Sequence, residues 1–209
     1  MTLFETFSLH QKLPITIDSI IETLLEKGYV QHNLLHEVFQ EEIVISGMLI
    51  RRQKCVAYTS NNGFVDVADI VYEGGLSDEG QRLVLAKELL HICDSEEATS
   101  RTDATVNDLT RELTLPTELL AELVHMRPET HADNLGLVRA VAILFPKECR
   151  DELKPAFDEG RLPIEIIHKM VDIPLPFIEL VMSDQWDAIY ETLAEQEKAL
   201  SCAPPTPAP

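Results

Sequence analysis

Apolar residues recur with the period of an α-helix near the start of the chain. Between residues 17 and 29 they gather on one helical face, and Asp18 and Glu22 lie near its beginning, where the helix dipole favours negative charge. We expect a second helix from about Asn33 to Gln40. The pattern therefore predicts N-terminal helices over residues 1–42.

The pattern changes to compact, β-branched runs after residue 42. Residues 43–50 and 55–59 have the composition of strands, and residues 60–63 are typical of a turn. Residues 64–72 favour a further strand. We therefore expect a small antiparallel sheet in this region.

Helical patterns return at residue 77 and fill most of the rest of the chain. Ser77 is a capping residue, and Asp78 and Glu79 follow it in the first turn. Further helices are expected over residues 135–145, 148–157, 160–171, 177–182 and 186–200. Residues 201–209 are rich in alanine and proline, and we expect a disordered, extended tail there.

The helices expected between residues 160 and 182 have the outline of a helix-turn-helix, but their charge argues against reading DNA. The second helix begins without Arg, Lys, Asn or Gln, the residues that address phosphates and base edges. From 161 to 187 the basic residues are Arg161 and Lys169, and the acidic ones are Glu165, Asp172, Glu179, Asp184 and Asp187. We interpret this pair as a packing or partner-binding element.

The whole chain is strongly acidic, with a formal charge of −19 from 36 acidic and 17 basic residues. Because this charge repels polyanions, direct binding of nucleic acid is not expected. One interpretation of this acidity is that it keeps the protein soluble. The alternative is an acidic surface that docks a basic protein or imitates DNA. No apolar run is long enough to span a membrane and residues 1–5 lack the features of a secretion signal, so we expect a cytoplasmic protein.

The four cysteines do not point to a metal site or to disulfides. Cys55, Cys93, Cys149 and Cys202 lie far apart and form no Cys-x-x-Cys pair. This spacing argues against both a disulfide framework and a thiolate zinc site.

One helical stretch has nearly the residues of a zinc-peptidase helix. Such a helix carries two histidines at i and i+4, which bind one zinc ion, and a glutamate that activates the metal-bound water. Here Glu88 and His91 are present, but Lys87 stands in the first histidine position. Lys87, Glu88, His91 and Asp94 fall within an arc of roughly 120° on the helix, which fits either a site or the solvated face of an amphipathic helix.

The flanking residues resemble the ImmA/IrrE family of bacterial and phage zinc metallopeptidases. Residues 82–91 follow the family pattern Arg-Phe-Thr-Leu-Ala-His-Glu-Leu-Gly-His, and residues 103–116 follow its next helix without a gap. By this resemblance Asp103 matches the acidic metal ligand, Asn107 the family's asparagine and Pro116 its closing proline. The resemblance covers roughly residues 43–116 and implies a zincin-like core.

The departures from the family pattern fall on the metal site itself. Lys87 replaces the first histidine, Leu90 replaces a glycine, and Asp103 is one methylene shorter than the usual glutamate. A charged lysine has no lone pair for zinc, and a catalytic zinc normally has three protein ligands. We therefore expect the zinc site to be lost or severely weakened, and we expect no cofactor.

Two accounts of the altered site follow. In the first, the Lys87 ammonium replaces the positive charge of zinc among Glu88, Asp94 and Asp103, in a metal-free remnant of the cleft. In the second, the protein is a zinc peptidase in which Glu88 is the general base and His91 and Asp103 are ligands. The third ligand would then be Asp94, or alternatively His125 or His131.

Together these patterns predict an α+β protein that is mainly helical. We expect N-terminal helices over 1–42, a metallopeptidase-like core with a small antiparallel sheet over 43–120, a helical region over 121–200 and a tail over 201–209. The expected function is non-catalytic protein binding or regulation through the old cleft. The partner would be a repressor or another cytoplasmic protein, and no membrane is involved. The cleft residues are Lys87, Glu88, His91, Asp94 and Asn107.

Overall fold

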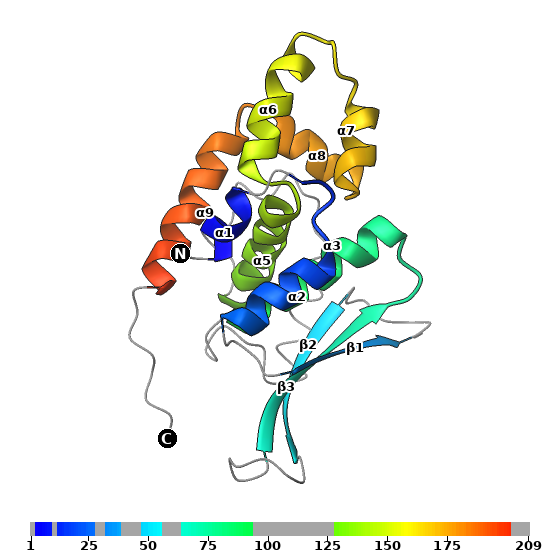
Figure 1. Ribbon diagram of the computed structural model, residues 1–209, viewed down its shortest axis with the longest axis vertical. Helices are drawn as coiled ribbons and strands as arrows, with labels where there is room; N and C mark the ends of the chain where they lie inside the picture. Colours follow the sequence, from blue (N-terminus) through cyan, green and yellow to red (C-terminus); the bar gives the residue numbers. More distant parts are fainter. Residues whose placement is uncertain are drawn as a thin grey trace. The chain divides into compact units, whose positions relative to one another are not determined.

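The computed structural model describes residues 3–9, 12–27, 32–38, 47–55, 64–93 and 128–201. The chain has an α+β fold, whose elements Figure 1 labels. It divides into two compact units. Unit 1 combines Met1–Thr16 with Val141–Pro209, and unit 2 comprises Ile17–Ala140. No helix in the described part of the chain is long and apolar enough to cross a membrane.

Unit 2 contains a three-stranded sheet in the order β1-β3-β2. β1 (His32–Val38) runs parallel to β3 (Phe64–Glu73), and β2 (Gly47–Cys55) runs antiparallel to it. Ile70 of the central strand is fully buried and lies opposite Leu35 on one side and Leu49 on the other. The sheet is therefore mixed, and only its β2–β3 half has the antiparallel pairing that the sequence predicts.

One expectation about this region is wrong. The helix expected over residues 33–40 is, in its described part, the strand β1 (His32–Val38), because its backbone pairs with β3, and such non-local pairing overrides a weak local propensity. The strand-like runs expected over 43–50 and 55–59 are joined, because β2 continues through Arg51–Lys54. β2 lies at an edge of the sheet, where charged residues are well tolerated.

The helices α2 and α3 of unit 2 begin close to the positions that the sequence predicts. α2 covers Ile17–Glu26, and α3 covers Asp78–Leu90. The Ser77 hydroxyl caps α3 by accepting a hydrogen bond from the backbone N–H of Gly80 at 3.2 Å. α3 is followed by the short 3₁₀ helix η1 (His91–Cys93).

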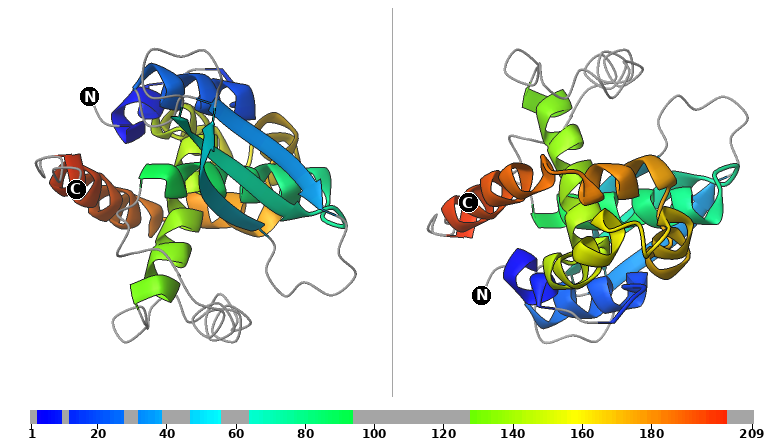
Figure 2. Two further views of the ribbon diagram at one scale, coloured as in Figure 1. Left: turned by 90° about the horizontal axis from the view of Figure 1, so that it is seen from below. Right: turned by 90° about the horizontal axis from the view of Figure 1, so that it is seen from above.

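One face of α3 packs against the sheet. α3 lies across β2 and β3, with α2 beside it (Figures 1 and 2). Among the described residues of unit 2, these two helices supply most of the buried apolar side chains: Ile20, Leu24, Leu83, Ala86, Leu89 and Leu90. α5 (Pro128–Leu144) begins in unit 2, and the boundary between the units falls within it.

Unit 1 is formed by helices from both ends of the chain. They are α1 (Leu3–Ser8), α6 (Lys147–Asp158), α7 (Ile164–Val171), α8 (Leu175–Met182) and α9 (Trp186–Ser201). The helix pair expected between 160 and 182 is present as α7 and α8, joined at Asp172, which adopts a left-handed conformation with φ of 60°. The buried core includes Phe4, Phe7, Phe145, Ile167, Ile178 and Trp186.

Candidate functional site

Lys87 and Glu88, on the last turn of α3, form a buried ion pair. The Lys87 ammonium lies 3.0 Å from Oε1 of Glu88, and the two side chains are only 8% and 4% exposed. A solvated stripe on an amphipathic helix would leave both side chains in water. That interpretation is therefore wrong for these two residues.

Two glycines allow neighbouring elements to approach this part of α3. A Cβ on Gly136 of α5 would lie 2.8 Å from Cε1 and 3.0 Å from Nε2 of His91, and 3.4 Å from Cγ of Lys87. A Cβ on Gly47, the first residue of β2, would lie 3.0 Å from Oε1 of Glu88 and would also collide with Val84. α5 and β2 thus approach the last turns of α3 closely at Lys87, Glu88 and His91.

The described residues do not fit a zinc ion. A zinc ion beside Glu88 would lie next to the buried ammonium of Lys87, so the two positive charges would repel each other strongly. The Cε1–Nε2 edge of His91 faces the backbone of α5. Among the described residues, no three His, Cys, Asp or Glu side chains are grouped to hold a metal ion.

Several residues that the sequence singles out lie outside the described part of the chain. These are Asp94, Asp103, Asn107 and His125. His131 lies in α5, in a part of the helix whose side chains are not described. The structure therefore brings together Lys87, Glu88 and His91, and the rest of the expected cleft stays a prediction.

Among its described residues, unit 2 buries two further charged side chains, which the sequence pattern does not single out. Asp69 on β3 is 6% exposed and Arg139 on α5 is 5% exposed. Each interrupts an apolar pattern: Asp69 shares the alternation of Val65, Val67 and Val71, and Arg139 is the charged residue in the run 135–145. With Lys87 and Glu88 they give two buried acids and two buried bases, so these charges sum to zero although the chain carries −19.

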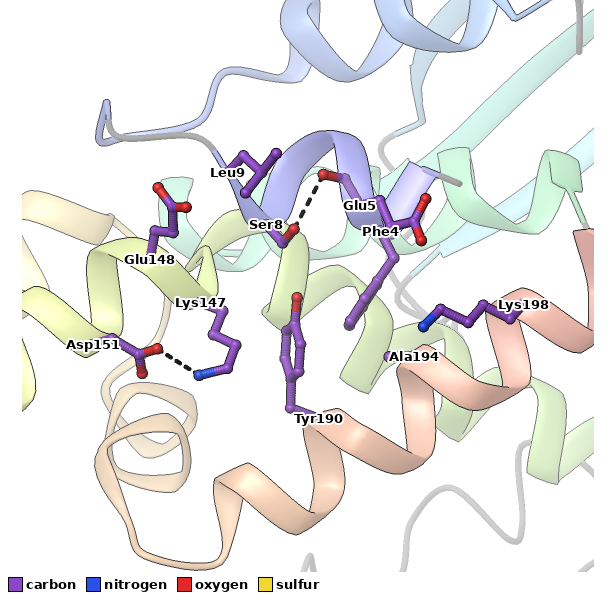
Figure 3. A pocket seen from close by; sticks show the side chains of 10 residues that line it. All are labelled: Phe4, Glu5, Ser8, Leu9, Lys147, Glu148, Asp151, Tyr190, Ala194 and Lys198. Carbon is purple, nitrogen blue, oxygen red and sulfur yellow. Dashed lines mark hydrogen bonds and ion pairs between the residues drawn. The ribbon is translucent and has the colours of Figure 1, made fainter. Parts of the chain in front are cut away.

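Unit 1 contains a separate pocket of about 380 Å³ between α1, α6 and α9. Figure 3 shows the rings of Phe4 and Tyr190 in it, with centroids 4.6 Å apart, and the ammonium of Lys147 between Asp151 and Tyr190. Burial raises the pKa of the Tyr190 hydroxyl, and a hydrogen bond with Ser8 partly opposes this rise. In the wall of this pocket Tyr190 thus contacts the hydroxyl of Ser8 and the ammonium of Lys147.

Comparisons of the chain with models of protein families, with curated proteins and with solved structures found no match. The resemblance to the ImmA/IrrE family therefore rests on residues 82–91 and 103–116 and stays a prediction.

Proposed function

We propose that this chain is a catalytically inactive relative of the ImmA/IrrE metallopeptidases and acts in the cytoplasm by binding another protein. The buried pair of Lys87 and Glu88 supports this proposal. The proposal also rests on the sequence resemblance, since Asp103 and Asn107 lie outside the described residues.

The pair removes the two functions that hydrolysis needs from this helix. A general base must be free to take a proton from the attacking water, but Glu88 here accepts from a cation at 3.0 Å. A catalytic zinc needs a third protein ligand, and the residue in the first ligand position is an ammonium. Lys87 instead supplies a positive charge that pairs with the buried carboxylate of Glu88.

The partner is expected to be a protein with a basic surface, because the chain carries a charge of −19. A cytoplasmic repressor is the kind of partner that the family resemblance implies. Lys87 and Glu88 are buried, so the partner would contact the surface around them, including the half-buried His91.

Metal analysis tests the inactive assignment. After dialysis against zinc, the purified wild-type protein is expected to hold no stoichiometric zinc and to hydrolyse no peptide. One zinc ion per chain that is lost in His91→Ala would overturn the proposal.

A second variant tests the resemblance separately. Lys87→His restores the family's first ligand, so this variant should take up zinc, and adding Glu88→Gln should leave zinc binding intact. Lys169→His on the exposed face of α7 is the matched control, because it adds a histidine where no site is proposed. If Lys87→His binds no more zinc than this control, the placement of the family's metal site on α3 is wrong.

The net charge also supports a second candidate function, an acidic inhibitor that imitates DNA. A protein captured by the immobilised chain from the native host separates the two candidates. Displacement of that partner by a short DNA duplex would favour the mimic, whereas binding that resists DNA favours the regulator.

A further inference from the structure

α7 in unit 1 is apolar on two faces. Ile167 and Val171 are fully buried in the core of the unit. Ile166 and Met170 lie about 100° around the helix from these two, and their exposed fractions are 43% and 39%. Because they are four residues apart, these two large side chains are neighbours on one exposed stripe of the helix.

Two opposite charges lie along one side of this stripe. Glu165 and Lys169 are exposed and are also four residues apart. At about 100° per residue, both fall on the same side of the line through Ile166 and Met170. Among the described residues, neither of these two side chains forms an ion pair, so both charges are available at the surface.

This arrangement is complementary to itself. We consider two α7 helices that pack antiparallel and are related by a twofold axis perpendicular to both of them. This axis reverses the direction of the helix, and it places the charged flanks of the two helices on the same side of the pair. Ile166 then faces Met170 of the partner subunit, and Glu165 lies beside Lys169 of the partner subunit. The same contacts occur twice by symmetry, with unlike charges together in both.

A pocket of about 250 Å³ extends from Met170 and Lys169 of α7 onto α6. Leu13 and Leu153 supply apolar walls of this pocket, and Glu152 adds a negative charge. A side chain of a second copy can therefore enter this pocket beside Met170.

We propose that two copies of this chain associate through α7 in an antiparallel, isologous contact. The proposal is independent of the function proposed for unit 2. The contact is weak and reversible for two reasons. The exposed apolar part of α7 consists of Ile166 and Met170, whereas each partner of a standard interface contributes about 20 to 30 residues, and the charge of −19 on each copy opposes association.

Sedimentation equilibrium of the full chain, from micromolar to millimolar concentration at physiological ionic strength, measures the association. The wild-type chain should show a concentration-dependent dimer. Ile166→Glu and Met170→Glu should each raise the dissociation constant about tenfold or more. The matched control is Leu9→Glu, because Leu9 is an apolar residue of the same unit with 61% exposure, and it should change little.

Charge exchange on α7 separates local pairing from net charge. Glu165→Lys changes the net charge from −19 to −17, and Lys169→Glu changes it to −21. Local pairing predicts that each single variant weakens the dimer and that the double variant, again at −19, recovers it. Net repulsion alone predicts that Glu165→Lys strengthens it.

Three results would overturn the proposal. They are a monomer at every concentration, tighter association of Glu165→Lys than of wild type, or a loss in Leu9→Glu equal to that in Ile166→Glu. Far-ultraviolet circular dichroism of each variant confirms that it is folded.

Discussion

If residues 82–91 align with the family's helix as proposed, Lys87 places one fixed charge where a divalent ion would bind. Its ammonium lies 3.0 Å from the carboxylate of Glu88, whereas a zinc ion would draw ligands from several elements. The pair is almost fully removed from water, so each of the two charges stabilises the other. The energetic role of the pair can therefore be measured apart from any activity.

A double-mutant cycle measures this dependence. Lys87→Met removes the cation beside the buried carboxylate of Glu88, and Glu88→Leu removes the carboxylate beside the buried ammonium of Lys87. Each single change should lower the free energy of unfolding by about 3 to 5 kcal/mol, and the double change should recover much of that loss. Urea unfolding followed by circular dichroism gives the three values.

The surface pair Lys147–Asp151 is the control for this cycle. Its side chains are 37% and 46% exposed, so Lys147→Met and Asp151→Leu should show a coupling of about 1 kcal/mol or less. A coupling for Lys87 and Glu88 no larger than this control would mean that water reaches the pair in solution.

Single residues also show where sequence reasoning succeeded and where it failed. Lys87 could be singled out from the sequence because the zinc-peptidase motif has a histidine at its position. Asp69 and Arg139 were missed because a charge within an apolar run can equally be a surface position. Their burial depends on which elements cover them, and composition does not contain that information.

At the scale of elements, α5 and α3 approach closely because Gly136 has no side chain. Gly136→Ala improves helix propensity by about 1 kcal/mol, but its Cβ would lie 2.8 Å from Cε1 of His91. Overpacking of this kind typically costs about 1 to 3 kcal/mol. We expect Gly136→Ala to lower the midpoint of urea unfolding.

The same substitution in the His91→Ala background is its control. With the imidazole removed, the alanine has room, and only the gain in helix propensity remains. Gly136→Ala should then be neutral or stabilising. A stabilising effect in the wild-type background would mean that α5 does not pack on His91.

The element boundaries show what local sequence can decide. The start of α3 could be predicted because Ser77, Asp78 and Glu79 are typical of a helix N-terminus. The capping hydrogen bond of Ser77 joins residues only three positions apart. β1 could not be predicted, because its strand state depends on pairing with β3, about thirty residues further along the chain. The sheet is mixed because β1 pairs with β3 in the parallel direction.

At the scale of the whole molecule, the two ends of the sequence fold together. Residues 1–16 belong to the same unit as residues 141–209, with the rest of the chain between them. The ring of Phe4 lies on that of Tyr190, and Phe7 is 1% exposed. Dividing the sequence into consecutive segments could not reveal this, because the contacts join residues more than 130 positions apart.

The single tryptophan allows this unit to be followed directly. Trp186 lies in unit 1 and is 1% exposed, so its fluorescence reports on the core that α1 helps to form. Phe7→Ala should lower the stability seen by this signal by about 3 to 5 kcal/mol, because it leaves a cavity in that core. Leu9→Ala, at a position with 61% exposure, should change it by about 0.5 kcal/mol or less. If Phe7→Ala leaves the Trp186 transition unchanged, α1 is not part of this cooperative unit, and the chain folds as consecutive segments after all.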